Sequence, residues 1–366
     1  MKIICRRSDL MNAVNIAMRA IPSKTTMPIL ESFLICADDR IIITSNDNDM
    51  SIETEVDGEI REKGKIAVEA RLFSDIVRKL PENEVCLDAD NNYKIRIVCE
   101  DVKISLSGNN PDEFPDLPET RALSHVSISE FTLKEMIRQT IFSIAVTDTN
   151  ALMKGELFSI SGNTLKMIAL DSHRIAIRRE KLANSYDASE VIIPGKTLNE
   201  ISRILAGDVE KIVELEFDRR FIKFIFSGTV VISRLIEGEF FNVERMVSSD
   251  YSTCITINKN DLMNDLDRAL TLTREGDRKP VVFEIRDSFI NIDITSSIGS
   301  MNSRLPVTKT GNDLIIGFNP RFIMDVLRVV DDEEVNLYFV NQNSPCFIRN
   351  DDEGYVYIIL PVNINR

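Results

Sequence analysis

One ten-residue pattern occurs three times in the sequence and limits the possible folds more than any other feature. The copies are RLFSDIVRKL at 71–80, KTLNEISRIL at 196–205 and RFIMDVLRVV at 321–330, so each begins 125 residues after the one before. Positions seven residues apart share one face of an α-helix, and each copy places basic residues at such a pair. The apolar positions form another face that can pack against a sheet. The repeat predicts similar domains, each with a helix that is apolar on one side and basic on the other.

The six basic residues of these helices are the first candidates for a binding surface. They are Arg71, Arg78, Lys196, Arg203, Arg321 and Arg328. One interpretation is a set of solvated faces with ion pairs such as Arg71 with Asp75. The other is a surface that meets phosphates. The chain has a net charge of −14, which repels nucleic acid, but the six expected helices together carry +4 and leave −18 for the rest.

A second helix precedes each copy and completes the repeated unit. Apolar stripes predict helices over 9–21, 131–145 and 260–273, with Ser8 as a helix-capping residue, and alternating segments predict several antiparallel strands in each unit. A turn insertion is expected at 206–210, in the second copy. Stretches rich in turn residues and acids, at 109–124 and 237–253, mark the joints. The expected fold is α+β, with three repeated domains of two helices packed on antiparallel sheets at 1–121, 124–248 and 251–366.

Several functional classes find little support in the sequence. No apolar run is long enough for a membrane span or a signal peptide, so a cytoplasmic protein is expected. The six cysteines lack metal-ligand spacing and are interpreted as reduced, buried small residues. There is no phosphate-binding glycine motif. Asp171, Ser172 and His173 are adjacent, so their side chains diverge and a catalytic triad is not indicated. We expect no cofactor, no metal and no catalytic residue.

Longer segments carry a resemblance to a known family. They are SKTTMPILESFLI at 23–35, VEARLFSDIVRKLP at 68–81, SGNNPDEFPDLP at 107–118, LDSHRIAI at 170–177, IIPGKTLNEISRIL at 192–205, IGFNPRFIMDVL at 316–327 and ILPV at 359–362. Together, in this order and over the full length, they resemble the bacterial DNA sliding clamp, the beta subunit of the DNA polymerase III holoenzyme. The resemblance implies three clamp-type domains forming half of a ring. It further implies a head-to-tail homodimer that encircles duplex DNA without sequence specificity, as a non-catalytic processivity factor.

The resemblance also implies partners and sites. The partners are a DNA polymerase catalytic subunit, the clamp loader, and other replication and repair proteins that carry a short clamp-binding peptide. Lys24, Arg138 and Asn150 join the six basic helix residues as DNA-binding candidates. Ile104 and Leu106 of one chain are expected opposite Leu272 of the other. The implied peptide pocket comprises Met153, Leu170, Ser172, His173, Arg174, Ile175, Phe241, Arg245, Met246, Asn319, Phe322, Leu360, Pro361 and Val362.

This chain departs from the family pattern at several positions. Phe241 stands where proline is usual, Ser172 where glycine is usual, and Asn363 where the tail normally bears a basic residue. Two other functional classes stay open at this point: a nuclease or phosphatase with clustered carboxylates that bind Mg²⁺, and a repeat scaffold that does not bind DNA.

Overall fold

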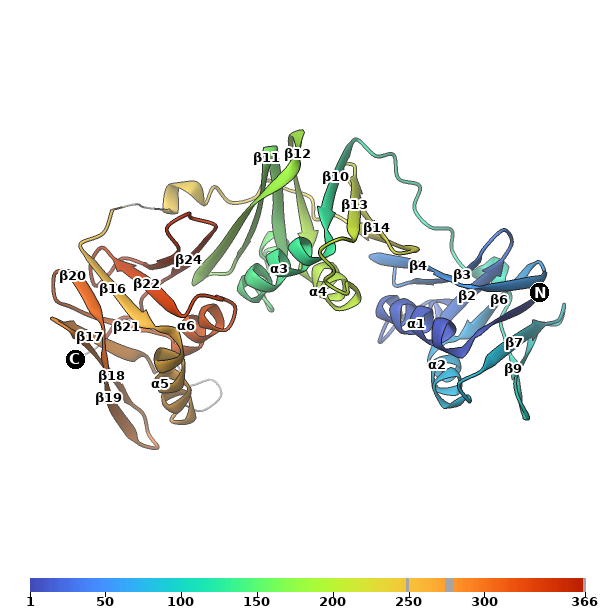
Figure 1. Ribbon diagram of the computed structural model, residues 1–366, viewed down its shortest axis with the longest axis horizontal. Coiled ribbons are helices and arrows are strands. Elements are labelled where there is room, and N and C mark those ends of the chain that lie inside the picture. The colour runs from blue at the N-terminus through green and yellow to red at the C-terminus, as the bar shows by residue number, and fades with distance from the viewer. Residues whose placement is uncertain (248–249, 274–278, 365–366) are drawn as a thin grey trace. The chain divides into compact units, whose positions relative to one another are not determined.

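The computed structural model describes residues 1–247, 250–273 and 279–364. This part of the chain contains six α-helices, and all six overlap the ranges expected from the sequence. They are α1 (Arg7–Ala17), α2 (Ala70–Lys79), α3 (Glu130–Thr140), α4 (Gly195–Ile204), α5 (Lys259–Thr271) and α6 (Pro320–Leu327). The expected α+β class, with two helices in each repeat and antiparallel sheets, is confirmed (Figure 1).

Contacts divide the chain into two compact units, and the first contains Met1–Phe131 and Arg203–Leu235. Its strands form a five-stranded sheet in the order β5-β1-β7-β8-β9 and an eight-stranded sheet in the order β10-β13-β14-β15-β4-β3-β2-β6. Their bounds are β1 (Lys2–Arg6), β2 (Ser32–Ala37), β3 (Ile41–Asn46), β4 (Met50–Val56), β5 (Gly58–Glu62), β6 (Gly64–Glu69), β7 (Glu84–Ala89), β8 (Lys94–Cys99), β9 (Val102–Ser107), β10 (Ser124–Ser129), β13 (Ile212–Phe217), β14 (Phe221–Phe226) and β15 (Thr229–Arg234).

The second unit contains Thr132–Ser202 and Ile236–Arg366. It has a seven-stranded sheet in the order β11-β12-β24-β23-β22-β16-β20 and a four-stranded sheet in the order β19-β18-β17-β21. The strands are β11 (Gly155–Leu170), β12 (Arg174–Pro194), β16 (Thr253–Asn258), β17 (Val281–Arg286), β18 (Phe289–Thr295), β19 (Ser300–Pro306), β20 (Thr308–Gly311), β21 (Leu314–Phe318), β22 (Glu334–Phe339), β23 (Cys346–Arg349) and β24 (Tyr355–Ile359).

The repeated helices pack in pairs over these sheets. Helices α1 and α2 contact each other in the first unit, and α5 and α6 do so in the second (Figure 1). Phe73 and Val77 of α2 and Ile323 and Val326 of α6 are fully or almost fully buried in the cores beneath them. The apolar face of each helix therefore lies where the sequence pattern predicts it, with Val77 rather than the half-buried Ile76 on the packed side of α2.

Sheets continue from one repeat into the next. In the first unit, β4 pairs with β15, with Thr54 opposite Thr229 and Met50 opposite Ser233. In the second, β12 pairs with β24, with Arg174 opposite Ile359. Because a paired edge leaves no row of unsatisfied backbone groups, both joints remove an exposed strand edge.

The first helix of each repeat begins in the same way. The first residue of α1, α3 and α5 donates its N–H to the carbonyl oxygen of Asn83, Lys211 and Glu333 respectively, at 2.8 to 2.9 Å. Ser8 was expected to cap α1, and this expectation is wrong: the helix begins at Arg7, and Ser8 lies inside its first turn. A backbone partner from the loop before β7 satisfies this helix end in place of a side-chain cap.

None of the described helices is long and apolar enough to cross a membrane. All six cysteines are unpaired; Cys5, Cys99 and Cys346 are buried and the other three are half-buried.

Candidate nucleic-acid and peptide-binding sites

The basic residues of the repeated helices are all exposed. This holds for Arg71 and Arg78 on α2, Lys196 and Arg203 on α4, and Arg321 and Arg328 on and after α6. Arg78 lies 3.5 Å from Asp75, and both side chains are about three-fifths exposed. Such exposed pairs are weak and leave the guanidinium accessible to another anion. The three helices therefore present cations at equivalent positions on surfaces that water reaches.

Arg71 is not paired with Asp75 as the solvated-face interpretation suggested. Its Nη2 donates to the carbonyl oxygen of Pro22 at 3.3 Å, and its backbone N–H donates to the capping carboxylate of Glu69. Pro22 belongs to the loop that carries the exposed Lys24. Arg71 thus connects α2 to that loop and brings the two candidate cations to the same part of the first unit.

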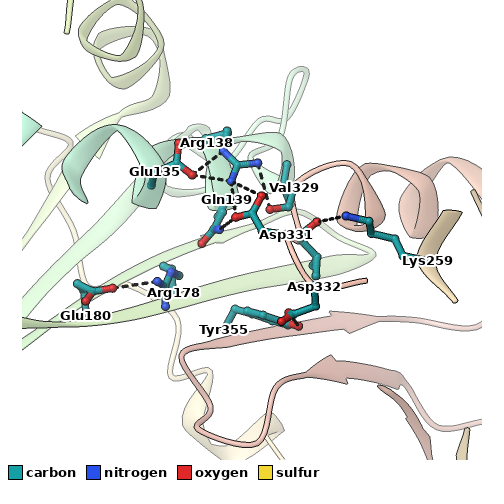
Figure 2. Close-up of polar contacts among 11 residues, drawn as sticks. Glu135, Arg138, Gln139, Arg178, Glu180, Lys259, Val329, Asp331, Asp332 and Tyr355 are labelled. Carbon is teal, nitrogen blue, oxygen red and sulfur yellow. Dashed lines mark hydrogen bonds and ion pairs between the residues drawn. The ribbon is translucent and has the colours of Figure 1, made fainter. Parts of the chain in front are cut away.

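Arg138 differs from the other candidates because its guanidinium is already engaged (Figure 2). It donates to Glu135 on its own helix, to Asp331 at 2.8 Å and to the carbonyl oxygen of Val329 at 3.1 Å. Asp331 also accepts from Gln139. Arg138 therefore ties α3 to the segment that follows α6, and its role in DNA binding stays a prediction.

Asn150 has a structural task as well. Its side-chain oxygen accepts from the N–H of Leu152 at 3.0 Å and so caps the short helix Ala151–Lys154. The side chain is half-buried, whereas the neighbouring Val146 and Thr147 are exposed. Asn150 shapes this loop, and a DNA contact from it stays a prediction.

The residues proposed for a peptide pocket gather in the second unit. One apolar cluster contains Leu170 and Ile175 as buried members, with Met153 and Phe241 packed against it. Met246 and Leu360 are 57% and 44% exposed, which is unusual for large apolar side chains and leaves them open to a partner. Arg245 lies in the short helix Glu244–Met246, and its side chain is outside the described part of the chain.

The C-terminal tail is held against this region by backbone hydrogen bonds. Leu360 donates its N–H to the carbonyl oxygen of His173, and Val362 donates to that of Gly317 on β21. A cavity lies beside the tail, lined by Ile315, Gln342, Asn343, Pro361, Val362, Asn363 and Ile364. Gln342 and Asn343 were not among the residues predicted from the sequence, since they lie on a turn without any pattern that marks them.

Arg174 organises the polar side of the pocket. Its Nε donates to Asp171, its Nη1 to Asp325 at 2.6 Å, and its Nη2 to the carbonyl oxygen of Phe142 at 2.6 Å. The guanidinium also lies over two aromatic rings, 4.7 Å from the centroid of Phe322 and 5.3 Å from that of Phe142. The His173 ring meets Phe322 edge-on. Asn319 begins α6 as its capping residue.

The residues proposed for a subunit contact lie at sheet edges. Ile104 and Leu106 are half-buried on β9, which is an edge strand of its sheet in the first unit. In the second unit, Leu272 follows α5, and its Cδ2 lies 3.4 Å from the position of a Cβ on Gly299, just before the edge strand β19. Each group thus lies on or beside a strand with unpaired backbone groups.

The Asp171, Ser172, His173 segment is a tight turn. The Asp171 carboxylate accepts from the N–H groups of His173 and Arg174 and from the Arg174 guanidinium. In the described residues, no three histidine, cysteine or acidic side chains gather as a metal site would require.

Comparison with known proteins covers almost the whole chain. Models of the DNA polymerase III beta subunit match in order: the N-terminal domain at 1–118, the central domain at 127–242 and the C-terminal domain at 244–363. The beta sliding clamps of Staphylococcus epidermidis and Bacillus subtilis are each 32% identical to this chain, over 99% of both sequences.

Solved structures give the same result. A DNA polymerase III beta subunit of Eubacterium rectale is 48% identical with a TM-score of 0.97, and the DNA polymerase sliding clamp of Bacillus subtilis is 31% identical with a TM-score of 0.95. In both cases the match covers 100% of either chain. With three repeats in the same order and relatives of the same length, this chain belongs to the DNA polymerase III beta subunit family, the sliding clamps.

Proposed function

We propose that the protein is a DNA polymerase processivity factor: a ring-shaped head-to-tail homodimer that encircles duplex DNA and tethers polymerases to it. The observation that carries the proposal is the exposure of Arg78, Arg203 and Arg328 at equivalent positions of three repeated helices. Cations on helix faces that contact phosphates, with no side chain inserted toward base edges, bind DNA without sequence preference. Such binding is salt-sensitive, and it allows the protein to slide.

The protein acts without catalysis in this proposal, in the cytoplasm. The clamp loader opens the ring, and polymerases and repair proteins bind by a short peptide in the pocket around Arg174. Exposed apolar side chains at Met246 and Leu360, beside the buried Leu170 and Ile175, supply the surface that apolar peptide anchors need. The edge strands β9 and β19 offer the backbone groups for a subunit contact.

The test is retention on circular DNA. We expect the loaded wild type to stay on nicked circular DNA and to leave after linearisation, because a closed ring is held by topology. The Arg78→Glu/Arg203→Glu/Arg328→Glu variant should fold but load or stay poorly. Its salt slope should flatten by roughly one unit for each lost phosphate contact.

The matched control reverses three exposed basic residues outside the helices, Arg96, Lys181 and Arg219, and so makes the same change in net charge. It should behave like the wild type. Equal retention and an equal salt slope for the helix variant and the control would refute a DNA surface on these helices. Wild-type retention that survives linearisation would refute the ring.

A further inference from the structure

A carboxylate on α6 holds the central residue of the peptide pocket in place. Asp325 Oδ2 accepts from Arg174 Nη1 at 2.6 Å; the Arg174 side chain is 11% exposed and that of Asp325 30%. Asp325 lies on the helix that carries Arg321 and Arg328, where its sequence position suggested only a pairing within the helix. Its distance from Arg328 is 3.9 Å, so the contact with Arg174 is the closer one.

The bond joins two separate segments of the second unit. Arg174 begins β12, and Asp325 lies in the middle of α6. Phe322 is three residues before Asp325, and residues three apart share one face of a helix. Helix α6 therefore presents a ring and a carboxylate to the same guanidinium: the ring lies 4.7 Å from it, and the carboxylate accepts from its end.

The remaining donors of Arg174 have partners of their own. Asp171 and the carbonyl oxygen of Phe142 accept from the other two nitrogens, at 3.1 and 2.6 Å. A planar guanidinium held by three acceptors in different directions has little rotational freedom. Because each nitrogen already has an acceptor, Arg174 does not offer a strong charge to a ligand. It stabilises the orientation of Phe322, against which the His173 ring packs edge-on at 5.7 Å.

We propose that Asp325 is a positioning residue of the peptide pocket: it fixes Arg174 from α6, so that Arg174, Phe322 and His173 form a rigid wall before a peptide arrives. This inference rests on the proposed peptide-binding function. Preorganised walls raise affinity because less side-chain freedom is lost on binding. Asp325 acts through Arg174 and not by touching the peptide.

The experiment is a fluorescence titration with a labelled synthetic peptide that has a glutamine followed by leucine and phenylalanine near its end. Asp325→Ala should weaken binding about tenfold, the usual order for one arm of a coupled network. Asp325→Glu, which keeps the charge, should recover part of the loss. The matched control is Asp75→Ala, the same position in the first copy of the helix, where Arg78 is the acid's neighbour; it should bind like the wild type.

A double-mutant cycle separates positioning from a general loss of structure. In an Arg174→Ala background, Asp325→Ala should change affinity less than twofold, because the residue through which it acts is gone. A tenfold loss in that background as well, or no loss in the wild-type background, would overturn the inference. Asp325→Asn, which keeps the volume and one acceptor oxygen, serves in place of Asp325→Ala if thermal unfolding shows that the alanine variant does not fold.

The two proposals fail in different ways. A wild type that does not bind the peptide at all overturns the pocket and this inference together. A wild type that binds, with an Asp325→Ala variant that binds equally well, overturns only the role of Asp325.

Discussion

Glu156 is a buried acid whose surroundings favour its neutral form. The side chain is fully buried at the start of β11, and burial raises its pKa from 4.5 to about 8. Thr140 Oγ1 lies 2.8 Å from Glu156 Oε2 and 2.7 Å from the carbonyl oxygen of Met136. A hydroxyl has one proton, so it can donate to only one of these oxygens. A protonated Glu156 can donate the second hydrogen bond itself.

This residue predicts a dependence of stability on pH. Below pH 4.5 the carboxyl is protonated in both the folded and the unfolded chain. Between 4.5 and about 8 the unfolded chain releases the proton while the folded chain keeps it, so the wild type loses stability as pH rises. Glu156→Gln cannot titrate and its amide can donate to Thr140. We expect its advantage over the wild type in urea unfolding to grow from pH 5 to pH 8, by up to a few kcal/mol.

The control for this measurement is Glu62→Gln, at an exposed residue that water reaches in both states. Its difference from the wild type should be the same at both pH values. A constant difference for Glu156→Gln as well would mean that Glu156 does not change its protonation relative to the unfolded chain over this range.

Single residues show where sequence reasoning ends. Arg78, Arg138 and Arg174 all occur in amphipathic or alternating segments, and nothing local distinguishes them. The helix period correctly predicts that Arg78 is exposed. The partners of the other two, Asp331 and Asp325, lie more than 150 residues further along the chain. Tertiary contacts of this kind leave no periodic signal, so the engaged state of Arg138 and the part of Asp325 in the pocket could not be predicted.

At the level of elements, the repeat predicted most of the architecture. The 3.6-residue period located all six described helices, and the apolar stripes chose their packed faces. Helix starts were less predictable. Ser8 has the chemistry of a cap, but the N–H of Arg7 finds a backbone acceptor in Asn83, and this longer-range contact sets the boundary. The long hairpin of β11 and β12, which continues to the pairing with β24, was also not expected from local alternation.

The contact between α3 and the segment after α6 yields a prediction that separates structure from DNA binding. Arg138→Ala removes the bonds to Asp331 and Val329 shown in Figure 2 and leaves Asp331 with fewer donors. We expect it to lower the free energy of unfolding by about 1–3 kcal/mol, as for a partly buried charged hydrogen bond. The salt slope of DNA retention should stay that of the wild type.

Arg78→Ala is the matched comparison, since Arg78 is exposed and only weakly paired. It should leave the unfolding midpoint almost unchanged and lower the salt slope by about one unit. If Arg138→Ala flattened the slope as Arg78→Ala does, the residue would contact DNA as the sequence suggests, and its ion pairs would be secondary.

At the scale of the whole molecule, the strand edges determine how copies can assemble. Edges at the two joints inside the chain are paired, β4 with β15 and β12 with β24. The edge strands β9 and β19 belong to different repeats and have no partner strand on their outer sides among the described residues. A contact between unlike edges is heterologous, and it gives a finite ring only if the rotation closes after a fixed number of copies.

Head-to-tail closure of two copies makes a specific prediction for single and mixed variants. Leu106→Asp places a charge on β9 and Leu272→Asp places one beside β19, so each variant alone has a damaged residue in both contacts of the ring. Each should sediment as a monomer. The control is Ile60→Asp on β5, the opposite edge of the sheet that contains β9, where the side chain is also half-buried; it should remain a dimer.

Mixing the two variants distinguishes this arrangement from a symmetric contact. In a head-to-tail pair, the intact Leu272 side of one variant meets the intact Leu106 side of the other, so one of the two contacts is restored while both charges fall in the second. The mixture should therefore contain a heterodimer in native mass measurements. This heterodimer should not stay on nicked circular DNA, because a ring joined at one contact is open. If β9 instead paired with β9 of the partner, Leu272→Asp alone would remain a dimer, and the head-to-tail ring would be wrong.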